Sequence, residues 1–377
     1  MVLLYVADEG FSFYNGEYYF TRPNYINTLQ FGKYFDKVIY VARKSLYVKG
    51  SIKISEDSKV YLFNKLDFRG LKGFLKEHKN EYDAALLRNG MNGCIAVNTL
   101  HKLKKTIISY LGYDALSYKL SQRKITSIVE GLFWYFLEKN KMSKGTYAHY
   151  CSDYLVKKYP AKVPFLVCPN VDINPDNKNL TDRIDRISKE EDKITIGLIA
   201  TLNKNKGIGV AIRSISMLPK SFSLEIVGAG NKEDYVSLAQ QLKVEDRVKF
   251  LGYYAQKEDI NEWLKKVDIY IQPSLSEGIP RSAIEAMAAA CPLIVSRTIG
   301  ASSWIDEKWH IKPRDYKSLA NKILEMGENK ELLKQQASKN FETSKMFISQ
   351  VREEKMDSYY WEFLENMDKN NENKATD

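Results

Sequence analysis

Cysteine and histidine are scarce in this chain of 377 residues, which has four of each. The cysteines lie far apart without paired spacing, which argues against a disulfide framework or a zinc site and favours buried thiols. They are Cys94, Cys151, Cys168 and Cys291. No two histidines stand at the spacing of metal ligands. The sequence therefore predicts no metal site built from its own side chains.

A long apolar run is also absent. No stretch of about 18 apolar residues occurs, so we expect no segment to cross a membrane. The first residues, Met1–Ala7, resemble a β-strand and lack the basic leader and small-residue cleavage site of a secretory signal. We therefore expect a cytoplasmic protein.

Positive charge is unevenly distributed along the chain. The net charge is +10, and residues 1–165 contain 26 Lys and Arg against 14 Asp and Glu. This basic half suits an anionic partner, namely nucleic acid, an anionic membrane surface or an acceptor that carries phosphate. A solvated surface without a partner explains any single lysine equally well. Nucleic acid is the least favoured and not expected, because no motif for reading it is recognisable.

The order of apolar runs predicts an α/β protein. Short runs rich in β-branched and aromatic residues alternate with segments of helical spacing, which is typical of parallel sheets. The first group is Val2–Ala7, Lys37–Ala42, Lys59–Phe63, Ala84–Leu87 and Thr106–Tyr110. The second is Ile194–Ala200, Ser223–Val227, Val248–Leu251, Ile269–Gln272 and Leu293–Ser296. The chain is long enough for two such domains with separate cores.

A polar stretch from Asn174 to Lys193 separates the two groups of strands. It contains Pro175 and repeated Asp and Asn, and it is predicted to be a surface connection. We place the domain joint near it, so that residues 1–165 form the first domain and residues 166–348 the second.

The C-terminal part is predicted to be helical. Lys317–Glu328 and Glu331–Phe341 have helical periodicity, and Ser349–Met367 predicts a further helix that returns to the first domain. Residues 368–377 are polar and are predicted to be disordered.

The most informative motif follows the run Ile269–Gln272. A loop carries Glu277 and Gly278, Pro280 suits the first turn of a helix, and Glu285 lies inside that helix. Free amides at a helix N-terminus, with Gly278 allowing close approach, form an anion site suited to a diphosphate. Glu285 can then accept hydrogen bonds from ribose hydroxyls, while Glu277 reaches the other end of the ligand.

Two alternatives to a diphosphate site fit the same residues. The glutamates could be the acid and base of a glycoside hydrolase, but a phosphate site between them has no use in hydrolysing a neutral sugar. The pattern could also be purely structural, with a proline at a helix start and two surface glutamates.

The same motif carries a resemblance to a known family. Glu277 and Glu285, within Pro-Ser-Leu-Ser-Glu-Gly-Ile-Pro and Glu-Ala-Met-Ala, resemble the signature of the retaining family-4 glycosyltransferases of the GT-B fold. The resemblance spans roughly residues 165–345. It includes Asn170-Val171-Asp172, Lys206-Gly207, Ile226–Gly230, Arg247–Gly252 and Val267–Tyr270. In the first domain only Tyr5–Asp8 and Tyr14–Gly16 resemble capsule or O-antigen members of the family.

This resemblance implies two Rossmann-like, doubly wound domains that face each other across a cleft, and a donor site in the second. In the family, the lysine matching Lys206 neutralises donor phosphate, the residue matching Glu285 holds the ribose, and Glu277 contacts the hexose. Further donor contacts are implied for Gly252, Tyr253, Gly278, Ile279, Pro280 and Arg281. The donor would be a UDP- or GDP-linked sugar, and catalysis would need no metal or other cofactor.

Two departures from the family pattern bear on catalysis. Thr201 stands where the family commonly has a phosphate-binding arginine, so Arg281 or Arg88 would have to replace it. The common acidic residue near the last strand is also missing, and Gly300–Trp304 stands there. These losses imply an altered donor choice or weaker catalysis.

Acceptor contacts are expected from the first domain, where open α/β sheets place ligands at strand ends. We assign them to Asp8, Gly16, Arg88, Asn89 and Asp114. Asp114 lies near the position where many family members carry a histidine beside the acceptor, so it joins Glu277 and Lys206 as a candidate catalytic residue. A helix N-cap is the favoured alternative for Asp114. His149 is expected to be structural.

The segment Leu100–Gly145 alternates basic residues with apolar and aromatic ones, including Ile107, Tyr110, Phe133 and Phe136. This pattern suits the interface of an anionic membrane, where a polyprenyl-diphosphate-linked acceptor would be presented. A core helix with one solvated face explains much of the same pattern. On the membrane interpretation, the protein would sit peripherally on the inner face of the cell membrane.

The expected function is therefore retaining transfer of a hexosyl or N-acetylhexosaminyl group onto a lipid-linked glycan during surface polysaccharide synthesis. A sugar-nucleotide 2-epimerase is one alternative, since it can share the fold. A catalytically degenerate sugar-nucleotide-binding subunit is another, in view of Thr201 and Trp304.

Overall fold

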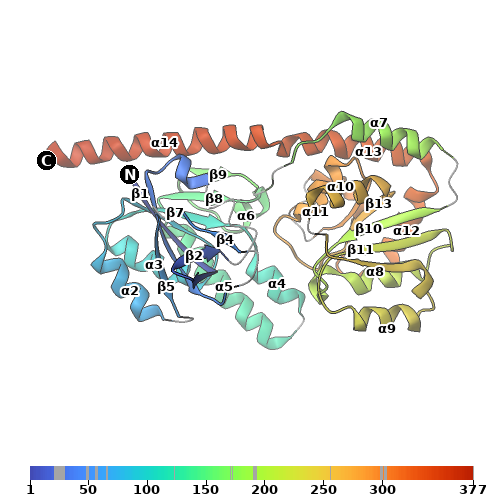
Figure 1. Ribbon diagram of the computed structural model, residues 1–377, viewed down its shortest axis with the longest axis horizontal. Coiled ribbons are helices and arrows are strands. Elements are labelled where there is room, and N and C mark those ends of the chain that lie inside the picture. The colour runs from blue at the N-terminus through green and yellow to red at the C-terminus, as the bar shows by residue number, and fades with distance from the viewer. Residues whose placement is uncertain are drawn as a thin grey trace. The chain divides into compact units, whose positions relative to one another are not determined.

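The structure is a computed structural model, shown in Figure 1. It describes residues 1–20, 30–47, 51–55, 58–64, 67–122, 124–169, 171, 173–189, 193–254, 256–297, 300 and 304–376. The chain forms two compact units. Unit 1 contains residues 1–113, 132–170 and 353–377, and unit 2 contains residues 114–131 and 171–352. The predicted division was at residues 165 and 348, with residues 114–131 in the first domain.

Unit 1 is built on a mostly parallel sheet. The strands pair in the order β4-β2-β1-β6-β7-β8-β9, and β3 joins β1 to β5. Their bounds are β1 Val2–Tyr14, β2 Glu17–Phe20, β3 Lys37–Lys44, β4 Ile52–Lys53, β5 Lys59–Phe63, β6 Ala84–Leu87, β7 Thr106–Leu111, β8 Tyr147–Tyr150 and β9 Phe165–Val167. Every residue of β6 is buried, as expected for a central parallel strand that is covered on both faces.

Helices cover this sheet. They are α2 Phe68–Glu77, α3 Met91–Lys102, α5 Ile125–Lys144 and α6 Asp153–Lys158, while α4 Ala115–Ser121 groups with unit 2. Leu71 and Leu75 of α2 and Val97 of α3 pack against β1 and β6 in one apolar cluster. The predicted strands are all present, and β1 is longer than predicted.

The extension of β1 corrects one sequence expectation. Asp8 was expected to follow the first strand, but β1 continues through it to Tyr14 and then turns back into β2. Asn15 and Gly16 form the two-residue turn with φ of 48° and 83°, as an Asn-Gly hairpin turn requires. The Asn-Gly pair was the available signal for this hairpin, and the apolar-run criterion missed it.

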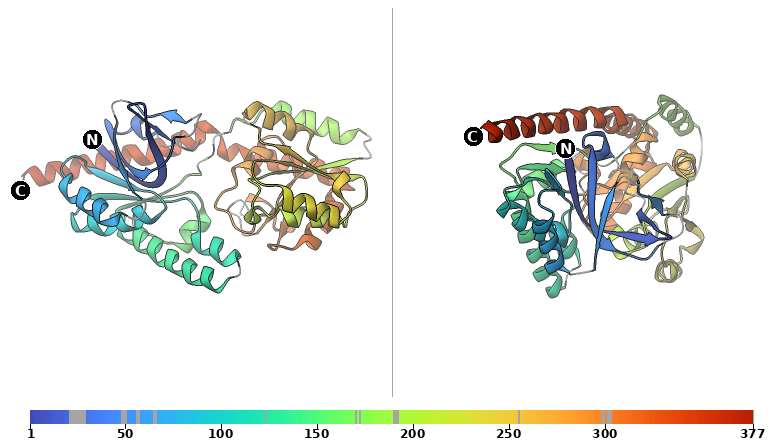
Figure 2. Two further views of the ribbon diagram at one scale, coloured as in Figure 1. Left: turned by 60° about the horizontal axis from the view of Figure 1, so that its bottom comes forward. Right: turned by 60° about the vertical axis from the view of Figure 1, so that its left-hand side comes forward.

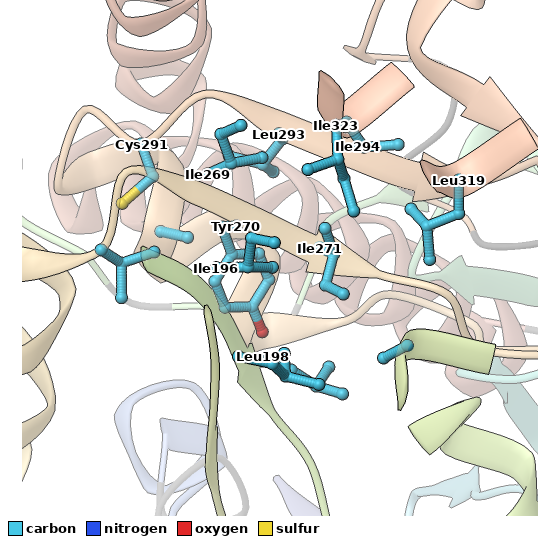
Figure 3. Packing of buried hydrophobic residues seen from close by; sticks show 14 of the residues in the cluster. Ile196, Leu198, Ile269, Tyr270, Ile271, Cys291, Leu293, Ile294, Leu319 and Ile323 are labelled. Carbon is cyan, nitrogen blue, oxygen red and sulfur yellow. The ribbon is translucent and has the colours of Figure 1, made fainter. Parts of the chain in front are cut away.

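Unit 2 contains a six-stranded parallel sheet in the order β12-β11-β10-β13-β14-β15. The strands are β10 Ile194–Ile199, β11 Phe222–Val227, β12 Val248–Gly252, β13 Ile269–Gln272, β14 Leu293–Ser296 and β15 His310–Ile311. Figure 3 shows side chains of β10, β13 and β14 packed together in its core. The five predicted strands of this unit agree with the structure to within one residue at each end.

The helices of unit 2 cover both faces of its sheet. They are α7 Asn177–Ser188, α8 Ile208–Ile215, α9 Glu233–Gln241, α10 Lys257–Lys266, α11 Arg281–Ala288, α12 Tyr316–Gly327 and α13 Lys330–Ser344. Figure 1 shows α8 and α9 on one side and α7, α10 and α13 on the other.

Helix α7 overturns the prediction that residues 174–193 are a surface connection. Its Ile187 is buried, and so is the side chain of Arg183, which donates hydrogen bonds to the carbonyl oxygens of Leu264 at 2.7 Å and Ala289 at 3.1 Å. The polar composition concealed the helix, because one of its buried residues is charged and donates hydrogen bonds to backbone carbonyls.

Helix α14, Ser349–Thr376, is longer than the helix predicted for residues 349–367. It continues beyond Met367 into the residues 368–377 that were predicted to be disordered. No proline or glycine interrupts residues 349–376, so no residue there breaks the helix. Figure 2 shows the length of this helix.

The part of α14 in unit 1 is tied to β8. The Tyr359 hydroxyl donates to the carbonyl oxygen of Ala148 at 2.9 Å, and the Tyr360 hydroxyl lies 3.1 Å from Nδ1 of His149. Both Tyr360 and His149 are buried. The expectation that His149 is structural agrees with these contacts.

The cysteines are buried, as the sequence predicts, and all four are free. Within the described ranges, none of the helices is long and apolar enough to cross a membrane.

Candidate functional site

Two loops of unit 2 meet at the carboxyl end of its sheet. The first follows β10 and contains Lys204–Lys206, and the second follows β13 and leads to α11. The Asn205 side-chain amide donates to the carbonyl oxygen of Ser276 at 2.7 Å, and the Leu275 backbone amide donates to that of Asn205 at 2.7 Å. Strands β10 and β13 are neighbours, so the sheet brings these loops together.

Gly207 lets the loops approach this closely. Its φ is +71°, and a Cβ atom at this position would lie 2.1 Å from the carbonyl oxygen of Pro273. Only glycine fits both the left-handed backbone and this contact. The glycine of the Lys206-Gly207 motif is therefore required where the two loops cross.

Lys206 and Glu277 form an ion pair where the loops cross. Their side chains are 26% and 10% exposed. Burial and, to a smaller extent, the nearby charge of Arg281 lower the pKa of Lys206 to about 8. Lys206, Glu277 and Arg281, three residues that the sequence assigned to the donor, are thus brought together.

Helix α11 begins beside this ion pair. Pro280 is its N-cap residue in an extended conformation, and Arg281 is the first helical residue. Pro280 itself makes no side-chain hydrogen bond to this end of the helix. The first-turn amides of such a helix suit an anion. The predicted helix start near Pro280 is confirmed.

Glu285 lies further along α11 in a pocket of its own. The pocket has a volume of about 210 Å³ and contains no residue of the Lys206–Glu277 pair. Its other lining residues are Ile173, Asn174, Asn179, Lys257, Asn261, Ala288 and Ala289. Burial raises the pKa of Glu285, and Arg281 and Lys257 partly oppose this rise.

The remaining donor predictions fall at different places. The Gly278 carbonyl accepts a hydrogen bond from the Gly300 amide at 2.6 Å, and Ile279 packs against an apolar cluster that includes Ile173 and Phe347. Gly252 is the last residue of β12 and Tyr253 follows it, and two strands separate β12 from β13. Trp304 packs against the Phe347 ring at 4.5 Å, so this departure from the family pattern has a structural role.

The acceptor predictions of unit 1 gather around the N-terminus of α3. Asp8 accepts hydrogen bonds from the amides of Met91 at 2.6 Å and Asn92 at 2.9 Å, so it caps this helix. The Arg88 guanidinium pairs with Glu9 at 3.1 Å and lies 4.0 Å from the centre of the Tyr110 ring.

A buried ion pair supports the Arg88–Gly90 loop, and sequence reasoning missed it. Lys141 pairs with Glu138 at 2.6 Å, and both side chains are fully buried. Glu138 accepts hydrogen bonds from the Asn89 side chain and the Gly90 amide, at 3.2 and 3.4 Å. The sequence signal for this pair was the spacing of Glu138 and Lys141, two opposite charges three residues apart on α5. Both side chains face the core.

The other two acceptor predictions lie elsewhere. Gly16 is in the hairpin turn, and Asp114 is the N-cap of α4, where it accepts a hydrogen bond from the Ser117 amide at 3.3 Å. The helix-cap interpretation of Asp114 is confirmed, while its catalytic role stays a prediction. Asn170, Asp172 and residues 301–303 of the sequence motifs lie outside the described residues.

A larger pocket of about 970 Å³ lies within unit 2. Four of its lining residues are cationic and none is acidic, which suits an anionic group. The cationic residues are Lys124, Lys204, Arg213 and Arg314. Among the described side chains, no group of three or more His, Cys, Asp or Glu is arranged to hold a metal ion.

Comparison with known proteins places these features in context. Residues 181–343 match the family described as Glycosyl transferases group 1. Protein CapJ of Staphylococcus aureus is 28% identical over 350 residues, which cover 86% of this chain and 85% of CapJ. The amylovoran biosynthesis glycosyltransferase AmsK of Erwinia amylovora is 32% identical over 143 residues, covering 34% of this chain and 35% of AmsK.

Solved structures show the fold. HepE of Anabaena in complex with UDP superimposes with a TM-score of 0.69 at 16% identity, over 95% of this chain and 99% of HepE. The chain has the GT-B fold, with two Rossmann-like α/β units, and the predicted fold class is confirmed.

Proposed function

We propose that this chain is a retaining glycosyltransferase of family 4 that uses a nucleotide diphosphate sugar. The family match and the similar proteins support its assignment as a glycosyltransferase. The transferred group would be a hexosyl or N-acetylhexosaminyl residue, and the donor a UDP- or GDP-linked sugar. The observation that carries the proposal is the Lys206–Glu277 pair beside the start of α11, where Pro280 makes no side-chain cap hydrogen bond. The UDP in the complex with HepE supports the choice of donor.

The phosphates of the donor would bind at the start of α11. A nucleoside diphosphate gains negative charge as its bond to the sugar breaks, and fixed positive groups stabilise that charge most in the transition state. Lys206, Arg281 and the first-turn amides of α11 are such groups. They supply the positive charge without a metal ion, and Arg281 compensates for the arginine that Thr201 replaces.

The sugars at the two ends of the donor would contact the two glutamates. Glu285, with Asn261 and Lys257 in the same pocket, suits the ribose hydroxyls, because a carboxylate and an amide oxygen accept hydrogen bonds from them. Glu277 precedes the start of α11, whereas Glu285 lies inside the helix, and Glu277 would contact the hexose. The acceptor hydroxyl would attack the face that the diphosphate leaves, and an oxygen of the leaving group would help to take its proton.

We further propose that the acceptor is a polyprenyl-diphosphate-linked glycan in surface polysaccharide synthesis. The relative AmsK, an amylovoran biosynthesis glycosyltransferase, supports a polysaccharide product. The acceptor contacts would come from Asp8, Gly16, Arg88, Asn89 and Asp114. Asp8 and Asp114 also cap helices, so they would in addition hold the backbone of the acceptor loops in place.

Helix α5 supports peripheral contact with an anionic membrane at the cytoplasmic face. Six large apolar residues on it are exposed, at the three- and four-residue spacing of one helix face. They are Ile125, Ile128, Val129, Leu132, Phe133 and Phe136, here called the α5 stripe. By contrast, Ile107 and Tyr110 of the predicted interfacial segment are buried in β7, where the core explanation holds.

A panel of nucleotides and nucleotide sugars tests the donor proposal. We expect one donor family to raise the melting temperature of the wild type, since a ligand that binds only the folded state stabilises it. Glu285→Ala should lose most of this shift, whereas Glu258→Ala, an exposed glutamate on α10, should keep it. No shift with any uridine or guanosine nucleotide would count against the proposal.

Product analysis separates the proposed reaction from its alternatives. Transfer to a lipid-linked glycan with the anomeric configuration of the donor supports the retaining transferase. A nucleotide sugar that changes stereochemistry without an acceptor would identify an epimerase. Binding without turnover across acceptors would identify a degenerate binding subunit.

A further inference from the structure

A chain of buried polar groups lies behind Glu277. It consists of Tyr270 and Gln272 on β13, with Ser274 and Ser282 on either side of the loop. Tyr270, Gln272 and Ser274 are completely buried. Strands in this position are normally apolar, as the rest of β13 is, so the polar chain needs an explanation.

The hydrogen bonds fix the direction of the Gln272 amide. The Tyr270 hydroxyl oxygen accepts from the backbone amide of Ile199 at 3.2 Å, and Figure 3 shows this hydroxyl reaching toward β10. Its single proton is therefore free to be donated to Oε1 of Gln272, at 3.0 Å. The Ser282 hydroxyl donates to the same oxygen at 3.2 Å.

With its oxygen occupied in this way, Gln272 presents its amide protons to the loop. Nε2 donates to Oγ of Ser274 at 2.9 Å and to Oε2 of Glu277 at 3.1 Å. The other carboxylate oxygen of Glu277, Oε1, pairs with Lys206. Both oxygens of Glu277 are thus held, one by a cation of the proposed phosphate site and one by the buried amide.

We infer that Gln272 is a positioning residue that sets the orientation of the Glu277 carboxylate for the proposed transfer. This inference rests on the proposed function, since it assigns Glu277 a contact with the donor sugar. When the diphosphate attracts Lys206, Gln272 remains as the fixed donor to Glu277. The carboxylate then keeps its orientation while its other oxygen becomes available to a sugar hydroxyl.

Three substitutions test this role. Gln272→Met keeps the volume and removes the amide, and Tyr270→Phe removes the group that orients it. A displaced catalytic contact lowers the rate more than the affinity, so kcat should fall on the order of 10- to 100-fold while KM for the donor changes less. Gln272→Glu should behave like Gln272→Met at neutral pH, because its carboxylate cannot donate to Glu277.

The dependence of kcat on pH in Gln272→Glu distinguishes a positioning role from a purely structural one. If Gln272 only stabilised the fold, kcat of this variant would not recover at low pH. A carboxylic acid donates a proton in its neutral form, so kcat of this variant should recover partly as the pH falls. Gln336→Met replaces another buried glutamine, on α13, and is the matched control. It should lose a similar amount of thermal stability and keep its kcat.

The outcomes are distinct. A kcat of Gln272→Met equal to that of Gln336→Met, or no recovery of Gln272→Glu at low pH, overturns the positioning role. No turnover by the wild type with any donor and acceptor overturns the proposed function, and this inference falls with it.

Discussion

Lys206 shows how one residue combines burial and charge. An exposed lysine has a pKa near 10.5, and burial beside Arg281 lowers the pKa of Lys206 to about 8. Its ammonium group is poorly hydrated and pairs with the carboxylate of Glu277, with which a phosphate would compete. A phosphate partner would restore the pKa, and binding above pH 8 would therefore take up a proton.

The pH dependence of nucleoside diphosphate binding follows from this pKa. The charged form of Lys206 binds phosphate and is present below pH 8. Affinity should therefore fall as the pH rises through about 8, by up to roughly tenfold per pH unit. Isothermal titration calorimetry between pH 7 and 9.5 measures this fall.

Lys206→Arg should remove this dependence, because a guanidinium does not titrate in the range. Lys204→Arg, on an exposed neighbour in the same loop, should leave the dependence unchanged. An equally steep fall in affinity for Lys206→Arg would show that another group titrates.

The residues that sequence reasoning found share one property. Lys206, Glu277 and Glu285 belong to a local pattern of a loop followed by a helix start, and such a pattern fixes geometry over a few residues. Gln272, Glu138 and Lys141 act through contacts within the folded core. Their side-chain directions depend on which face of a strand or helix is buried, and composition alone does not reveal this.

The elements were predicted best where buried strands alternate with helices. Strands β13 and β14 agree with the prediction at both ends, because a short apolar run in an α/β protein is typical of a buried strand. Helix α7 and the end of α14 were missed because polar composition was taken as a sign of irregular structure. Helical spacing in α7 and the lack of proline or glycine in α14 were the better signals.

The α5 stripe leads to a prediction at the element scale. A solvent-exposed apolar helix face bordered by the exposed Lys124 and Lys139 suits an anionic bilayer. Binding to vesicles rich in phosphatidylglycerol should fall at least about tenfold in Phe133→Ser/Phe136→Ser, since burying each aromatic ring contributes more than about 1 kcal/mol. Vesicle flotation at low salt measures it.

Exposed apolar residues elsewhere provide the control. Met217→Ser/Met346→Ser changes two exposed side chains of unit 2 and should leave vesicle binding unchanged. A dimer in light scattering that dissociates in Phe133→Ser/Phe136→Ser, with no vesicle binding by the wild type, would instead show that the α5 stripe contacts a second copy of the chain.

At the scale of the whole molecule, the C-terminal helix completes unit 1. Tyr360 is buried against Phe31 and Tyr34, with ring centres 5.5 and 5.0 Å away. Tyr360→Ala should destabilise unit 1 by about 3–5 kcal/mol, as removal of a large buried aromatic side chain does. Calorimetry should show the transition of unit 1 at a lower temperature.

The neighbouring aromatic residue is the matched control for this prediction. Trp361 is 46% exposed, so Trp361→Ala should cost much less than Tyr360→Ala. Equal shifts for the two variants would contradict the packing of α14 against unit 1.

The chain leaves unit 1 after residue 170 and returns to it at residue 353. Most of unit 2 is thus an insertion with two junctions. A hybrid made from two parent enzymes by a single crossover near residue 170 would pair the terminal helix of one parent with the sheet of the other. Hybrids with a second crossover near residue 352 would keep each helix with its own sheet. The segment between the two crossovers, which contains the proposed donor site, should therefore be exchangeable between parent enzymes.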